Sequence, residues 1–371
     1  MRVAIDGLVL GGAGSGVERA VEQMAGAMAC IDGLEVGLVC TPAYAERARA
    51  AGLQPLVAPA CTQSRAGRIL FEQLLMSGRL RKQAWPLLHG PAYIVPPMFR
   101  GVSVVTVYDL IALQYPQWCK VSNVAHFRFM LPASMAAAGI IIAPSQTVAD
   151  SICNAFPRLA PKVRLVHLGI GEQFRRVDDA GQIEQVRRRY CLPERFVLCL
   201  GNIEPRKNLP AVVAAFEQVV ESEDVHLVIA GPKAWKCRSI RRRIAQSPRT
   251  DRIHMPGNIA EADLPALYSM SALLVQWSLY EGVGLPPLEA MACGTPTIVS
   301  DGGALAELAG QAAEIVPLPD PEALADGILR LLRDEMRRKQ IAKDGARLAA
   351  RWTWPDHARR VAGLYKEASG G

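Results

Sequence analysis

The chain has 371 residues, half of them hydrophobic, and this length and composition are typical of about two domains that each bury a core. Nine cysteines without a C-x-x-C or zinc-like spacing are typical of reduced thiols in a cytoplasmic protein, and they argue against a metal site. The formal charge of +7 favours an anionic partner. Because the basic residues are not interleaved with aromatic residues, nucleic acid is disfavoured, which leaves donor phosphates or an anionic membrane surface.

The amino-terminal segment MRVAIDGLVL predicts a first strand and not a signal peptide, because Asp6 and Gly7 interrupt its apolar residues. No apolar run approaches the roughly 18 residues that are needed to span a bilayer. We therefore expect a cytoplasmic protein that is soluble or at most peripheral to the membrane.

Short apolar segments alternate with helical patterns along the chain. The predicted strands form a first series at residues 2–5, 35–40, 86–88, 102–107, 139–143 and 163–166, and a second at 196–200, 226–230, 252–255, 271–277, 297–299 and 313–316. Such short strands, buried on both faces and separated by helices, predict parallel sheets. The alternation is interrupted near residues 169–176, so we expect an α/β chain of two doubly wound domains, at residues 1–170 and 171–355.

A glycine-rich loop, GGAGSG at residues 11–16, comes directly before a predicted helix at residues 17–28. The loop lacks the G-x-G-x-x-G spacing of a dinucleotide fingerprint. Its last glycines, Gly14 and Gly16, can present amides to a phosphate at the helix start. A simply flexible loop is an equally good interpretation of the residues alone.

The segment at residues 64–85 mixes apolar and basic side chains. Its apolar residues are Ile69, Leu70, Phe71, Leu74, Leu75 and Met76, and its basic residues are Arg65, Arg68, Arg79, Arg81 and Lys82. This composition suits an interfacial helix on anionic lipids. A helix packed on the core with a solvated basic edge explains it as well.

Two strands of the first series end in polar residues. VVTVYDL ends in Tyr108 and Asp109, and Asp109 either orients an acceptor hydroxyl or caps the following turn. APSQTVADSI carries Ser145 where it would cap a helix, which we interpret as structural.

GNIEPRKNL, at residues 201–209, follows the strand FVLCL and precedes a predicted helix. It begins with Gly201 and Asn202 and places Arg206 and Lys207 at a helix start, where cations are disfavoured unless an anion binds there. A guanidinium and an ammonium beside a diphosphate would neutralise the charge that grows on a leaving group.

GPKAWKCRSIRRR, at residues 231–243, is the largest basic cluster. A solvated helix face is the default interpretation of such a run. Gly231 and Lys233 nevertheless follow a predicted strand, so they would lie at the ligand-binding edge of the sheet.

WSLYEGVGLPPLEAMACGTPTIVSD, at residues 277–301, predicts a strand, loop, helix and strand in succession. Prolines 286 and 287 suit the first turn of the helix, and Gly294 suits its end. The loop residues Gly282, Val283, Gly284 and Leu285 would let an anion approach the backbone. Glu281 and Glu289 flank that position, and a carboxylate suits a vicinal diol of a sugar. The alternative is that Glu281 caps the helix and Glu289 is solvated, but the helix is otherwise apolar around Glu289.

EGVGLPPLEAMACGTPTIVS resembles the E-x7-E signature of the GT4 family of retaining glycosyltransferases, and the likeness extends over most of the chain. The resemblance implies the GT-B architecture, with two Rossmann-like domains facing across a cleft and a last helix, residues 356–371, that packs back on the first domain. It also implies that Glu281 contacts the transferred sugar and Glu289 the donor ribose. By the same likeness, Arg206 and Lys207 hold the donor phosphates, the loop at Gly16 closes over the diphosphate, and Gly231 and Lys233 approach the base.

The chain departs from the family pattern at two positions. Tyr108 replaces the usual histidine, and a tyrosine keeps a hydrogen bond but does not become cationic near neutral pH. Asn202 replaces a frequent arginine, so the phosphate site depends more on Arg206 and Lys207. No Asp-x-Asp motif for a metal is present, and we expect no cofactor and no metal requirement.

We therefore predict a retaining, metal-independent glycosyltransferase that moves a hexose from a nucleotide-diphosphate sugar to a glycan or lipid-linked acceptor in cell-envelope polysaccharide biosynthesis. EPRKN resembles bacterial polysaccharide mannosyltransferases, which favours GDP-mannose as donor. The alternatives are a UDP-sugar transferase acting on a small acceptor, a nucleotide-sugar epimerase or hydrolase on the same fold, and a non-catalytic nucleotide-sugar-binding partner.

Overall fold

The computed structural model describes residues 1–12 and 15–370, and its contacts divide the chain into two compact units. The first unit comprises Met1–Pro116, Val121–Gly169 and Trp352–Gly371. The second comprises Gln117–Lys120 and Ile170–Arg351. The predicted boundaries, after residues 170 and 355, did not include the four residues from 117 to 120 in the second unit.

The first unit is built on a seven-stranded sheet in which every pairing is parallel. Its strands, in spatial order, are β3 (Gln54–Val57), β2 (Glu35–Cys40), β1 (Arg2–Asp6), β4 (Leu87–Gly90), β5 (Val102–Thr106), β6 (Ile140–Ala143) and β7 (Val163–Leu165). The order reverses direction between β1 and β4, which is the switch point of a doubly wound sheet.

The second unit repeats this plan with a six-stranded parallel sheet. Its strands, in spatial order, are β10 (Ile253–Gly257), β9 (His226–Ala230), β8 (Phe196–Leu200), β11 (Leu273–Gln276), β12 (Thr297–Val299) and β13 (Glu314–Ile315). The switch point lies between β8 and β11. The two sheets confirm the prediction of two doubly wound α/β domains.

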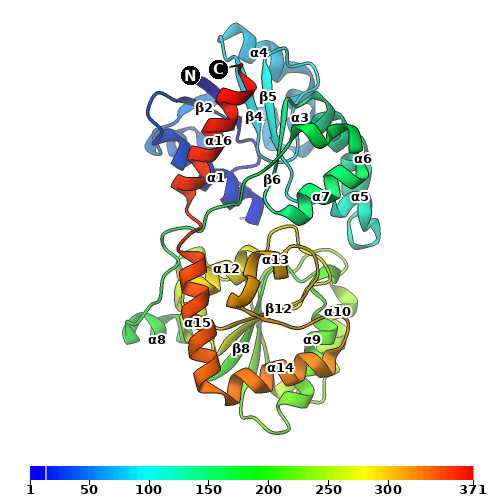
Figure 1. The fold of residues 1–371 in the computed structure, drawn as a ribbon, viewed down its shortest axis with the longest axis vertical. Helices are drawn as coiled ribbons and strands as arrows, with labels where there is room; N and C mark the ends of the chain where they lie inside the picture. The colour runs from blue at the N-terminus through cyan, green and yellow to red at the C-terminus, as the bar shows by residue number, and fades with distance from the viewer. Residues whose placement is uncertain (13–14, 371) are drawn as a thin grey trace. The chain divides into compact units, whose positions relative to one another are not determined.

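Helices flank both sheets (Figure 1). Those of the first unit are α1 (Gly16–Ala29), α2 (Ala45–Ala50), α3 (Arg65–Leu70), α4 (Met76–Lys82), α5 (Ile111–Gln114), α6 (Val121–Ala137), α7 (Gln146–Ala155) and α16 (Trp354–Ala368). Those of the second are α8 (Ala180–Arg189), α9 (Leu209–Val219), α10 (Arg238–Ala245), α11 (Leu264–Met270), α12 (Leu285–Ala292), α13 (Leu305–Ala309), α14 (Pro321–Arg333) and α15 (Glu335–Ala349). In the second unit α9 packs against α14, and Phe216 and Ile328 belong to one buried cluster with strand residues such as Val197.

The last helix, α16, packs beside α1 in the first unit, where the red and blue ends of the chain meet (Figure 1). Tyr365 is fully buried on this helix, and its hydroxyl lies 2.7 Å from Nδ1 of His89 at the end of β4. Thr353 caps the helix by accepting a hydrogen bond from the Asp356 amide. The helix therefore begins at Trp354, two residues earlier than predicted.

The apolar and basic segment at residues 64–85 forms α3 and α4 joined by a π-helical turn, Phe71–Leu75. Phe71, Met76 and Leu80 are buried in the core of the first unit. Leu70, Leu74 and Leu75, by contrast, are 56%, 62% and 54% exposed. The segment thus packs on the core and also presents apolar side chains to solvent.

Two local predictions are confirmed by the structure, and one strand was not predicted. Ser145 accepts a hydrogen bond from the Val148 amide and caps α7, as predicted. The helix α12 begins at Leu285 with its prolines in the first turn, and Gly294 beyond its end adopts φ +73°. Strand β3 was not predicted; its Pro55 is tolerated because β3 is an edge strand.

No helix among residues 1–12 and 15–370 is long and apolar enough to cross a membrane.

Candidate functional site

The switch point of the second sheet brings together two loops that are distant in sequence. The loop after β8 carries Arg206 and Lys207 in a short 3-10 turn, Pro205–Lys207. The loop after β11 carries Glu281. A backbone hydrogen bond of 2.8 Å from the Leu279 amide to the Arg206 carbonyl joins the two loops. Ligands of doubly wound sheets bind at this edge, so the location alone makes it a candidate site.

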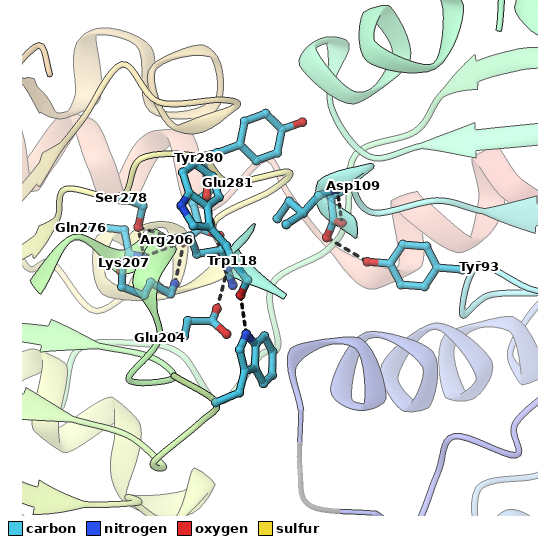
Figure 2. A network of polar contacts seen from close by, with 12 residues as sticks. Tyr93, Asp109, Trp118, Glu204, Arg206, Lys207, Gln276, Ser278, Tyr280 and Glu281 are labelled. Carbon is cyan, nitrogen blue, oxygen red and sulfur yellow. Dashed lines mark hydrogen bonds and ion pairs between the residues drawn. The ribbon is translucent and has the colours of Figure 1, made fainter. Parts of the chain in front are cut away.

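The Glu281 carboxylate is the centre of a polar network at this edge (Figure 2). Its Oε1 accepts hydrogen bonds from Lys207 Nζ at 2.6 Å, Gln276 Nε2 at 2.9 Å and Ser278 Oγ at 3.0 Å. Its Oε2 accepts one from Arg206 Nη1. A carboxylate offers about four lone-pair positions, so these donors use its accepting capacity. Glu281 thus organises both cations of the site.

Charge pairing controls the ionisation of this buried group. Burial raises the pKa of Glu281, but Arg206 and Lys207 outweigh it and lower the pKa to about 2. Burial lowers the pKa of the Lys207 ammonium, and the field of Glu281 opposes that effect. Glu281 is therefore a carboxylate at neutral pH, held in place between two cations.

Two members of the network, Gln276 and Ser278, were not singled out in the sequence. Both are buried, Gln276 as the last residue of β11 and Ser278 in the loop that carries Glu281. With Gly201, Asn202 and Lys207, they also line a small pocket. The sequence signal that marks them is a polar residue at every second position where an apolar strand ends.

Glu204 is a third residue that sequence reasoning missed. It is 1% exposed, and its Oε1 lies 2.5 Å from Arg206 Nε. Arg206 therefore lies between two carboxylates, Glu204 and Glu281. An acid next to a proline in a polar loop is normally solvated, so its burial could not be expected from its neighbours in sequence.

Glu289, the second acid of the E-x7-E pair, lies on α12 and is 3% exposed. Its Oε2 accepts a hydrogen bond of 2.8 Å from the Tyr268 hydroxyl of α11. The interpretation of Glu289 as a solvated helix residue is therefore wrong. The side chain is buried where α12 packs against α11, and its hydrogen bond from Tyr268 does not join it to the network around Glu281.

The glycines that end β8 and β9 allow a close approach of two backbones. Gly201 and Gly231 adopt φ +141° and +135°, and a Cβ on Gly231 would lie 2.1 Å from the Gly201 carbonyl oxygen. Larger residues are thus excluded at this corner of the pocket. Asn202, the next residue after Gly201, is half-buried, whereas Lys233 is exposed and forms a backbone bridge to Ile203 of this loop.

The loop before α12 was predicted to approach an anion. Its residues Gly282, Val283 and Gly284 are buried, and Leu285 is half-buried at the first position of the helix. Gly284 adopts φ +82°, and a Cβ there would lie 2.5 Å from a side-chain atom of Leu305. This loop is packed against its own unit.

In the first unit, Tyr108 and Asp109 follow β5 as predicted from sequence. Tyr108 is buried, and burial raises the pKa of its hydroxyl, which stays protonated. Asp109 accepts hydrogen bonds from the Tyr93 hydroxyl at 2.9 Å and from the Ile111 amide at 3.0 Å (Figure 2). The second contact fits the capping interpretation of Asp109.

The glycine-rich loop is described only in part. Gly16 is exposed and begins α1, with Ser15 accepting a hydrogen bond from the Glu18 amide as the helix cap. The Glu18 carboxylate in turn accepts a hydrogen bond of 2.7 Å from the Gly12 amide. Gly14, a predicted donor-binding residue, lies outside the described residues.

A second acidic pair lies at the carboxyl edge of the first sheet. Asp6 ends β1 and Glu72 belongs to the π-helical turn, and both are more than nine-tenths buried. Arg68 Nε is 3.5 Å from Glu72 Oε1. Burial raises the pKa of Asp6 to about 6, and burial together with Asp6 raises the pKa of Glu72 to about 8, so Arg68 does not compensate them fully.

No group of histidine, cysteine, aspartate and glutamate residues suited to a metal ion occurs within the described part of the chain.

Comparison with known families and proteins gives a consistent result. Residues 182–348 match the family described as Glycosyl transferases group 1. O-antigen chain mannosyltransferase B of Escherichia coli is 25% identical over 295 residues, which are 77% of this chain and 77% of that protein. The serotype-specific mannosyltransferase WbdA of Escherichia coli is 29% identical over 279 residues, 73% of this chain but only 34% of WbdA, so the chain spans about a third of that relative.

Among solved structures, Alr3699/HepE of Anabaena in complex with UDP and glucose matches with a TM-score of 0.77 and 17% identity. The match covers 99% of this chain and all of the HepE chain. The match shows the fold alone, with two doubly wound units as expected of the GT-B architecture.

Proposed function

We propose, from the premise that this chain is a glycosyltransferase with a group 1 domain at residues 182–348, that it transfers mannose from GDP-mannose to a glycan or lipid-linked acceptor in cell-envelope polysaccharide biosynthesis. The relatives named as O-antigen and serotype-specific mannosyltransferases support the sugar and the pathway class. The site itself supports a diphosphate donor, because its cations lie at the ligand-binding edge of the sheet.

The observation that carries this proposal is the pairing of Arg206 and Lys207 around Glu281 at the switch point. In free form, the carboxylate keeps two partly or fully buried cations side by side against their mutual repulsion. A donor diphosphate would meet a preformed guanidinium and ammonium, which would offset the negative charge that grows as the sugar–phosphate bond breaks. These cations would do the work of a metal ion, so we propose that transfer is metal-independent.

We propose a retaining reaction in which the acceptor hydroxyl enters on the face that the diphosphate leaves. The acceptor hydroxyl would pass its proton to the departing phosphate, and no protein nucleophile is assigned. Three of the four hydrogen bonds to Glu281 fall on Oε1, so a sugar hydroxyl would contact the carboxylate through Oε2, which accepts one bond, from Arg206 Nη1. The first role of Glu281 would be to hold the cations, and Glu289 would be the partner of the donor ribose.

The test combines binding and product analysis on the purified chain. Calorimetric titration with GDP, UDP, GDP-mannose and UDP-glucose identifies the donor, and incubation with a bacterial lipid extract identifies the acceptor. We expect GDP-mannose to bind, mannose to appear on lipid with its anomeric configuration retained, and the rate to be unchanged by EDTA. Inverted product or complete loss of activity in EDTA would overturn the corresponding part of the mechanism.

The same assay distinguishes the other functions. Turnover of a UDP-sugar on a small acceptor would replace the donor and acceptor assignment. Consumption of donor without acceptor would indicate an epimerase or hydrolase. Binding without any turnover would indicate a non-catalytic partner.

We further propose that the first unit contacts anionic lipid at the cytoplasmic membrane surface. The exposed side chains Leu70, Leu74 and Leu75 would enter the interface, and the basic residues Arg79, Arg81 and Lys82 of α4 would meet lipid phosphates. Vesicles with anionic lipid should bring the chain up a density gradient, and glutamine at the three basic positions of α4 should abolish flotation. A matched control replaces the exposed Arg238, Arg241 and Arg242 of α10, and equal loss in both variants would contradict a specific face.

A further inference from the structure

Glu204 is a buried carboxylate that the proposed reaction does not use. It is 1% exposed, and neither of its carboxylate oxygens receives a hydrogen bond from the residues described in the structure. Arg206 Nε lies 2.5 Å from its Oε1, and Lys207 also interacts with it electrostatically. Burying a carboxylate is costly unless it is paired, so the ion pair with Arg206 is the contact through which Glu204 can act.

The backbone around Glu204 holds it rigidly. The Ile203 amide donates to the Pro232 carbonyl at 3.0 Å, and the Lys207 amide donates to the Glu204 carbonyl at 3.1 Å, which closes the turn. Glu204 and Arg206 therefore occupy one fixed turn at the end of β8. The sheet and the turn thus fix the backbone from which the Glu204 side chain extends.

The Arg206 guanidinium contacts a carboxylate on each of two sides. Glu204 faces its Nε, and Glu281 from the loop after β11 faces its Nη1. A guanidinium is planar with its donors in a fixed fork, so partners on two of its nitrogens set its orientation as well as its position. A lysine at position 206 could not be oriented in this way.

We infer that Glu204 is a positioning residue that holds the Arg206 guanidinium in the orientation that receives the donor diphosphate. The inference rests on the proposed role of Arg206 at that diphosphate. Two acids, Glu204 and Glu281, balance two bases, Arg206 and Lys207, so the formal side-chain charge of this cluster is zero before the donor arrives. The negative charge of Glu204 weakens the attraction of the site for the donor diphosphate. At the same time, Glu204 fixes the orientation of the Arg206 guanidinium.

The first test of this inference does not depend on the donor. Crystal structures of the full chain and of the Glu204→Gln variant should show the Arg206 guanidinium displaced from Glu281 in the variant. Glu314→Gln is the matched control, because Glu314 is also buried in the second unit and also paired with arginines, Arg330 and Arg337. An unmoved Arg206 in Glu204→Gln would overturn the inference whether or not a donor has been identified.

The second test is a double-mutant cycle with the donor that supports turnover. We expect Glu204→Gln to lower kcat/KM about tenfold, with Glu314→Gln unchanged, and Glu204→Asp to recover part of the loss. In an Arg206→Ala background, Glu204→Gln should cause no further loss, because it acts through Arg206. Additive losses, or a gain in kcat/KM in Glu204→Gln, would show that Glu204 acts on the donor directly or merely competes with it.

Discussion

The carboxyl edges of the two sheets carry carboxylates in opposite electrostatic settings. In the second unit, Glu281 is buried between two cations that lower its pKa to about 2. In the first unit, Asp6 and Glu72 are buried beside each other, and their pKa values rise to about 6 and 8. Two parallel sheets of the same doubly wound plan thus differ in whether cations offset the charge of their buried acids. The carboxyl edge of the second sheet carries cations that can bind an anion. At the edge of the first sheet, the raised pKa values show that negative charge is unfavourable.

The largest expected effect comes from breaking the ion pairs at the edge of the second sheet. Glu281→Gln should reduce transfer about a thousandfold, because Arg206 and Lys207 lose the carboxylate that holds them together. Initial rates at saturating donor measure this loss, and circular dichroism establishes that the variant is folded. Glu314→Gln serves as control for removal of a buried, arginine-paired acid, and comparable turnover in Glu281→Gln and wild type would refute the proposed site.

Arg206→Lys tests whether geometry matters at this edge in addition to charge. A lysine keeps the positive charge but cannot contact Glu204 and Glu281 with separate nitrogens of a planar fork. We expect kcat/KM to fall about a hundredfold. If the lysine variant retained more than half of the wild-type value, the charge alone would suffice.

The pH dependence of stability should separate the two edges. The raised pKa values of Asp6 and Glu72 mean that their favourable contribution is present below the unfolded values near pH 4 and is lost as pH rises through about 6 and 8. The lowered pKa of Glu281 means that its contribution is present above pH 4.5 and is lost as pH falls through about 2. Between pH 5 and 8, only the first unit should lose stability through these groups.

Glu72→Gln measures that difference. In the wild type, the free energy of unfolding of the first unit should fall by about 3 kcal/mol between pH 5 and pH 8 through this group, and we expect the variant not to show that fall. Hydrogen exchange of amides in β1 and β2 reports on the first unit, and amides in β8 and β11 report on the second. A wild-type first unit that is equally stable at both pH values would contradict an uncompensated pair.

The smallest expected effect concerns Asp109. Because its carboxylate accepts from Tyr93 and from the Ile111 amide, Asp109→Asn should cost about 1 kcal/mol of stability and change kcat less than tenfold. Thermal unfolding and initial rates measure the two effects. A hundredfold loss of kcat without a change in stability would instead support a direct role at the acceptor.

Much of this molecule can be predicted from its sequence where local signals agree with the fold. The strands β2, β8, β9 and β12 have the predicted bounds, because short apolar runs between helices are typical of strands buried on both faces of a parallel sheet. Strand β4 was predicted at residues 86–88 but runs over Leu87–Gly90 and includes the buried His89. Its buried partners, Thr106 and Tyr365, lie 17 and 276 residues away in sequence.

In the polar network, too, residues marked by a local sequence signal could be predicted, and residues buried by distant contacts could not. Arg206 and Lys207 could be singled out because cations at a helix start contradict a local rule. No local rule is broken at Gln276, Ser278 or Glu204. Their burial depends on two loops that meet only when the sheet forms. The hydrogen-bond donors that surround a carboxylate such as Glu281 are therefore determined only when the sheet edge has assembled.

The chain leaves the first unit after Gly169 and returns to it at Trp352. During synthesis, the whole of the second sheet therefore emerges from the ribosome before α16 does. Until then His89 has no Tyr365 hydroxyl beside it, and α1 lacks the helix that covers it. The half of the protein that is translated first is thus the half that is completed last, and a nascent chain stalled before residue 352 would hold a finished second unit beside an unfinished first one.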